Sequence, residues 1–130
     1  MSIHGNWITA TLDYDITETG EFAGFDNAAW TELIDLDRTY DKVTVIIPTL
    51  GSATTTVCGV PEDGTALKTN IPLPIYTVNK AATGSYLQAT SDATTTCIVA
   101  FNIYGFRYIR IQLSAAQTSN RVFYCKGIKL

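Results

Sequence analysis

The chain has 130 residues, 46% of them hydrophobic and 16% charged, so we expect it to fold as one domain rather than stay disordered. No apolar run approaches the roughly 18 residues that cross a membrane, and the first residues lack the features of a signal peptide. The formal net charge is −3 and no continuous basic stripe is evident, which argues against nucleic acid as a general partner.

Residues 1–30 are predicted to form an irregular N-terminal leader, and residues 31–130 the main domain. The segment "DNAAWTELI" has apolar residues at helical spacing, so we expect a helical turn near residues 26–30, followed by a strand. The leader also holds aromatic residues that either anchor a partner or cap the end of their own domain: Trp7, Phe22, Phe25 and Trp30. Removing residues 1–25 is expected to leave a folded domain that no longer attaches to its partner.

Short runs rich in Thr, Val, Ile, Tyr and Phe follow, separated by turn-forming stretches such as "PEDGT". In the run "KVTVIIPTL", the side chains of Val43, Val45 and Ile47 share one face. Strands of this length at spacings of roughly 8–12 residues indicate an antiparallel sandwich or barrel. We predict a single all-β sandwich of about eight strands.

The clearest strand is "GFRYIRIQLS", because its residue types alternate at every step from Arg107 onward. Ile109, Ile111 and Leu113 are predicted to face the core, and Arg107, in the same phase, to pair with a carboxylate or reach the rim. The opposite face is a candidate partner-binding surface, or else the ordinary outside of a sandwich; its residues are Tyr108, Arg110 and Gln112. Replacing Tyr108 and Arg110 by alanine is expected to weaken assembly and leave the melting temperature nearly unchanged.

The charges are unevenly distributed along the chain. Residues 1–41 contain nine acids and one base, a net charge of −8, whereas residues 42–130 contain eight bases and three acids, a net charge of +5. This separation suits head-to-tail contacts between copies, or the docking of an acidic arm on another surface. An acidic face that simply contacts solvent explains the pattern equally well.

Residues with catalytic or metal-binding chemistry are scarce. The one histidine, His4, lies in a terminus that is expected to be mobile, which argues against a Ser-His-Asp triad or a His-rich zinc site, and the acids after Asp13 lack EF-hand spacing. Three widely spaced cysteines, Cys58, Cys97 and Cys125, are expected to be buried free thiols, with a single disulfide as the alternative. We therefore predict a protein without catalytic residues, metal or cofactor.

Two stretches, "ELIDLDRTYDKVTVIIPTL" and "FRYIRIQ", resemble strands of galactose-binding-like, discoidin-type jelly rolls. Together with "PEDGT" and a closing strand, they resemble more closely a group of small phage structural proteins, over residues 32–130. Neither pattern contains a catalytic residue.

The resemblance implies a jelly-roll β-sandwich on a virion: a capsid cement or decoration protein, often a homotrimer, made in the host cytoplasm. Its expected partners are the major capsid protein or other virion proteins, and other copies of itself. A tail or baseplate component is the next alternative within that class. A carbohydrate-binding module in host adsorption, with a glycan as its partner, is the alternative of a different class.

Overall fold

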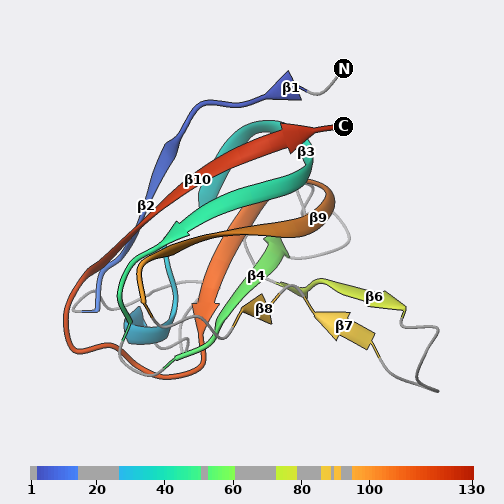
Figure 1. The fold of residues 1–130 in the computed structure, drawn as a ribbon. Coiled ribbons are helices and arrows are strands. Elements are labelled where there is room, and N and C mark those ends of the chain that lie inside the picture. The colour runs from blue at the N-terminus through green and yellow to red at the C-terminus, as the bar shows by residue number, and fades with distance from the viewer. Residues whose placement is uncertain are drawn as a thin grey trace, which may run out of the picture.

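The structure is a computed structural model that describes residues 3–14, 27–50, 53–60, 73–78, 86–88, 90–91 and 95–130. In chain order its elements are β1 (Ile3–His4), β2 (Ile8–Leu12), the 3-10 turn η2 (Asn27–Ala29), β3 (Ile34–Ile47), β4 (Thr55–Val60), β5 (Leu73–Pro74), β6 (Tyr76–Val78), β7 (Tyr86–Gln88), β8 (Thr90–Ser91), β9 (Cys97–Leu113) and β10 (Arg121–Lys129). Figure 1 shows their arrangement.

Within these residues every strand pairing is antiparallel, which confirms the prediction of an all-β fold. The larger sheet is eight-stranded, with the order β1-β10-β3-β9-β4-β5; β2 pairs with β10, and β8 pairs with β4. Strands β6 and β7 form a separate pair. The described part of the chain contains no α-helix, and η2 lies where the sequence predicts a helical turn.

The two longest strands, β3 and β9, bend sharply, and the bends fold the sheet over on itself (Figure 1). Their pairing shifts register between Asp35 and Tyr40 and again after Tyr40. Three residues near the bends have positive φ: Asp37 at 81°, Tyr104 at 53° and Gly105 at 94°. This backbone conformation is uncommon outside glycine, so the bends are specific local features.

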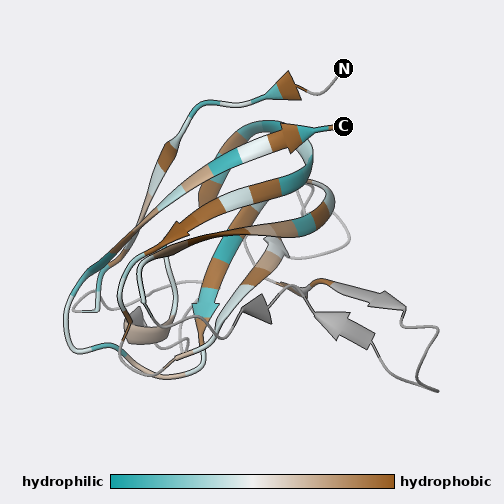
Figure 2. Cartoon of the chain, viewed as in Figure 1, coloured by the Kyte–Doolittle hydropathy of each residue, from teal (hydrophilic) through white to brown (hydrophobic). Residues whose placement is uncertain are grey.

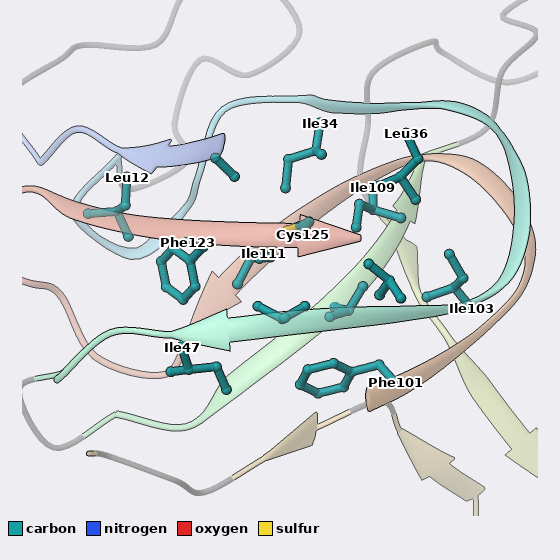
Figure 3. Close-up of a cluster of buried hydrophobic side chains, with 14 of the residues drawn as sticks. Leu12, Ile34, Leu36, Ile47, Phe101, Ile103, Ile109, Ile111, Phe123 and Cys125 are labelled. Carbon is teal, nitrogen blue, oxygen red and sulfur yellow. The ribbon is translucent and has the colours of Figure 1, made fainter. Parts of the chain in front are cut away.

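The bends divide the larger sheet into two halves. The β10 half contains β1, β2, β10, residues 40–47 of β3 and residues 97–106 of β9. The β4 half contains β4, β5, β8, residues 108–113 of β9 and the start of β3. The core lies between the halves, and Figure 3 shows side chains of both halves meeting there, among them Phe123, Ile111 and Ile34.

The predicted inward faces of two strands are confirmed. Figure 2 shows bands of alternating hydropathy along β9 and β10, as expected for strands with one face in a core. The side chains predicted to be buried are all 0–1% exposed: Val43, Val45, Ile47, Ile109, Ile111 and Leu113. Arg107 pairs with a carboxylate as predicted, since its Nε lies 2.9 Å from Oδ1 of Asp35.

The first residues of the chain belong to the sheet, which differs from the expectation of an irregular leader. Strand β2 pairs with β10 from Leu12↔Arg121 to Ile8↔Cys125, and its Ala10 and Leu12 side chains are fully buried in the core. A chain without residues 1–25 would lose this strand and its core side chains. We therefore expect that truncation to destabilise the domain rather than leave it intact.

Candidate interaction surface

The outward positions of the β10 half form a continuous surface, because its strands are paired in register. Tyr124 of β10 pairs with Ile46 of β3, and Ile46 pairs with Ile98 of β9. On its other side Tyr124 pairs with Thr9 of β2. These positions alternate with core residues such as Val45, so three apolar side chains lie in a row across the solvent side of the sheet.

The row is accessible. Ile98 is 66% exposed and Tyr124 is 44% exposed, while Ile46 between them is half-buried. Val122, two positions before Tyr124 on β10, is exposed as well. A contiguous exposed apolar surface, unlike scattered single residues, is a mark of interaction sites. We define the outer patch as six residues: Trp7, Ile46, Ile98, Val122, Tyr124 and Lys126.

Trp7 and Lys126 join the patch through their contact with each other. The Nζ atom of Lys126 lies 5.6 Å from the centroid of the Trp7 ring, and the indole is 47% exposed. Lys126 pairs with Thr44, which pairs with Ala100, so the ammonium group stands in the row next to the apolar one. Such a cation–π contact is worth about 0.5–1 kcal/mol at an exposed site. It holds an exposed aromatic ring at one side of the patch.

Of the other predicted contact residues, those that the structure describes lie apart from this patch. Trp30 is half-buried and forms an isolated bridge with Gln112, which is half-buried too. Tyr108 is also half-buried, and its ring centroid lies 5.0 Å from Cζ of Arg107. Phe22 and Phe25 lie outside the described residues, and their role stays a prediction.

The prediction that Arg110 lies on an open face is wrong. Its side chain is 2% exposed, and its Nε donates a hydrogen bond to the carbonyl oxygen of Thr31, 2.8 Å away. Its Cζ atom also lies 5.9 Å from the centroid of the Trp30 ring. The structure thus groups Trp30, Arg110 and Gln112, but with Arg110 as a buried residue that joins the segment before β3 to β9.

The physical reason is that β4, the neighbour of this part of β9, is buried on both faces. Arg110 pairs with Cys58 of β4, on the side of the sheet opposite the core. Cys58 and Val60 are on that same side and are 1% and 2% exposed. The phase predicted for the strand was therefore correct. The periodicity of one strand does not reveal whether other parts of the chain cover its second face.

Apart from Trp7, which was predicted as a contact residue, the outer patch was missed, although the sequence contains a signal for it. In "RVFYCKGIK" the core residues Phe123 and Cys125 alternate with Val122 and Tyr124, so large apolar residues occupy the solvent phase as well. A strand buried on both faces gives the same pattern. Only the register with Ile98 and the exposure of that residue distinguish the two cases.

Among the described residues, two thiols and one carboxyl group have clearly shifted pKa values. Burial raises the pKa of Cys58 to about 11 and that of Cys125 to about 12, so both remain protonated at neutral pH. The hydrogen bonds from Arg107 lower the pKa of Asp35. All three cysteines are free, as predicted, although Cys97 is only half-buried. None of these shifts produces an activated nucleophile.

Among the described residues, no three His, Cys, Asp or Glu side chains are grouped closely enough to hold a metal ion. In the same part of the chain, no helix has the length and apolar character needed to cross a membrane. Comparisons with protein-family models, with curated proteins and with solved structures found no match.

Proposed function

We propose that the protein is a non-enzymatic structural protein of a phage virion, a capsid cement or decoration protein that acts through protein–protein contacts. The resemblance of residues 32–130 to small phage structural proteins supports the assignment to a phage virion. The outer patch supports the mode of action, because Trp and Tyr side chains are enriched in protein interfaces. On this proposal the protein is made in the host cytoplasm and binds the major capsid protein, other virion proteins or its own copies.

The fold proposed with this function is a jelly-roll sandwich of about eight strands. The bent strands β3 and β9 each contribute to both halves of the sheet, and the core lies between those halves. Two packed antiparallel layers of this kind suit a rigid structural module. The observation that carries the functional proposal remains the outer patch, with its row of Tyr124, Ile46 and Ile98.

The proposal is tested by binding to assembled particles. Purified heads that lack the protein should bind it when it is added in solution. The Ile98→Asp variant should bind at least about tenfold more weakly, because a carboxylate would be buried in the contact. Leu73→Asp is the matched control, since Leu73 is also an exposed apolar strand residue, in the β4 half. Equal binding by both variants, or absence of the protein from intact heads, would contradict the proposal.

A carbohydrate-binding module of a tail fibre, baseplate or adsorption apparatus is the second candidate. Trp7 and Tyr124 favour it, since exposed aromatic rings can stack on sugar rings. A glycan array distinguishes the two functions. Binding to a sugar that is lost in Trp7→Ala and Tyr124→Ala, together with absence from heads, would favour the carbohydrate module.

A further inference from the structure

The size of the outer patch limits what can bind there. Strands lie about 4.8 Å apart and rise about 3.3 Å per residue, so four strands and five residues span roughly 300 Å². A stable interface covers about 800 Å² on each partner. The patch can therefore supply only the centre of a contact, and the positions around it must contribute the rest.

The charged positions on this face are cationic. Lys126 lies within the patch, and Lys42 lies four positions before Ile46 on the same face of β3. Among the described residues at the outward paired positions of β2, β10, β3 and β9 in this half, none is an acid. Charge complementarity therefore requires a partner that brings carboxylates to the rim of an apolar contact.

A symmetric pair of identical faces meets this requirement poorly, because the outward paired positions of both copies carry lysines and no acid. The start of β3 does meet it. Leu33 is an exposed apolar side chain, and Glu32 and Asp37 near it are exposed acids. None of these residues belongs to the outer patch, although Glu32 borders it: its Oε1 accepts a hydrogen bond from the amide of Thr11, 3.2 Å away, and Thr11 pairs with Val122.

We propose that the outer patch binds the acidic segment from Glu32 to Asp37 of a second copy, so that copies associate head to tail. The inference rests on the proposed function only in treating the outer patch as a protein-contact surface. A head-to-tail contact closes into a ring when the rotation between copies allows it, and a trimer is one such ring. The charge division of −8 and +5 between residues 1–41 and 42–130 suits the same arrangement.

Sedimentation velocity over a wide range of protein concentrations tests this arrangement. At low salt the wild-type chain should form oligomers, and at 1 M salt these should weaken at least about tenfold, because the screening length falls to about 3 Å. Ile98→Asp and Lys126→Glu should prevent association, whereas the control Leu73→Asp should associate normally. The proposal would be overturned if the wild-type chain is monomeric at every concentration, or if the Ile98→Asp variant associates as strongly as wild type.

A mixing experiment distinguishes head-to-tail from symmetric contacts. The double variant Glu32→Gln/Asp37→Asn neutralises two of the three acids of the segment and keeps similar shapes, while Asp35 remains paired with Arg107. It therefore weakens one surface and retains the outer patch. Ile98→Asp loses the patch but retains the acids. Each variant alone should be monomeric, and their mixture should form a one-to-one dimer. Association of the Glu32→Gln/Asp37→Asn variant by itself would show a symmetric contact between outer patches, and a mixture that stays monomeric while wild type associates would show that the two surfaces do not bind each other; either result would overturn the inference.

The outcome can be separated from that of the proposed function. If the protein binds heads through Ile98 but never self-associates, the head-to-tail inference fails and the virion function stands. If the mixture dimerises but no head binds the protein, the virion function fails and the self-contact stands. Circular dichroism and thermal unfolding of each variant must match wild type. This control shows that a variant loses association because a contact is removed and not because the domain unfolds.

Discussion

The ring of Tyr40 lies directly against the backbone of Gly127, so that a methyl group at position 127 would overlap the ring. The phenol oxygen reaches Gly5, where an added Cβ atom would lie 2.5 Å from it. The amide of Gly5 donates to the carbonyl oxygen of Gly127, 2.9 Å away. Tyr40 is therefore packed against β10 and against the residue that follows β1, at positions where both residues must lack a side chain.

This packing predicts that Gly127→Ala lowers the free energy of unfolding by about 1–3 kcal/mol, because the methyl group overpacks the core. Urea denaturation measures the change. In a Tyr40→Ala background the same substitution should cost much less, since the ring is gone. Equal costs in both backgrounds would mean that the ring does not occupy the space over Gly127.

The burial of Arg110 predicts a loss of stability on its replacement, whereas the sequence alone predicted a nearly unchanged melting temperature. Because its guanidinium group is buried and bonded to the carbonyl oxygen of Thr31, Arg110→Ala should lower the free energy of unfolding by about 2–4 kcal/mol. The double variant with Tyr108→Ala should melt at a lower temperature than wild type. The exposed Arg38 is the control, and its replacement by alanine should change stability by less than about 0.5 kcal/mol. An unchanged melting temperature for Arg110→Ala would contradict the observed burial.

Thr55 predicts a stabilising substitution. Its side chain is fully buried, and within the part of the chain that the structure describes its hydroxyl oxygen has no hydrogen-bond partner. Valine has the same shape without the hydroxyl, so Thr55→Val should raise the free energy of unfolding by about 1 kcal/mol. Thr31→Val is the matched control and should destabilise, because the Thr31 hydroxyl accepts from the amide of Ile111 at 3.0 Å. The result fails to support the assignment if both variants change stability in the same direction.

The ion pair between Arg107 and Asp35 predicts a pH dependence. Hydrogen bonds from Arg107 lower the pKa of Asp35 in the folded state below its ordinary value of 3.8. A lowered pKa means that the pair stabilises the fold above pH 3.8, and that this contribution is lost as the pH falls through the folded-state pKa. Wild type should therefore be more stable than Asp35→Asn at pH 6, and the difference should shrink on acidification. A difference that is constant down to pH 2 would contradict the role of the charge.

The three thiols should react at different rates with an aromatic disulfide reagent at pH 8. Cys58 and Cys125 are buried and have pKa values of about 11 and 12, so they should be almost unreactive in the folded protein. The half-buried Cys97 should react first. All three should react rapidly in denaturant. Release of one thiol equivalent before unfolding and three afterwards would support the assignment, and three rapid equivalents in the native state would contradict it.

Local patterns in the sequence predicted part of the fold and could not predict the rest. The alternation at Ile109, Ile111 and Leu113 depends only on the two-residue period of a strand, and it was read correctly. Near the bend at Asp37 and Tyr104, the pairing of β3 with β9 shifts register. No local sequence pattern predicts such a shift.

The candidate site depends on contacts between distant segments. The outer patch needs the register that aligns Tyr124 with Ile46 and Ile98. The burial of Arg110 depends on what covers the second face of the β4 half. Neither relationship is a property of one strand, so sequence alone placed the candidate contacts on Arg110 rather than on Tyr124.

The position of β10 determines the order in which the chain can fold. The last strand lies between β2 and β3, where Arg121 pairs with Leu12 and Lys126 pairs with Thr44. During synthesis, the edges of β2 and β3 that pair with β10 therefore remain unpaired until residues 121–129 have left the ribosome. Such pairing between segments far apart in the sequence is slow to form, and open edges invite pairing with a neighbouring chain in the meantime. We expect a nascent chain stalled before residue 121 to be sensitive to protease and prone to aggregate, and the completed chain to be resistant.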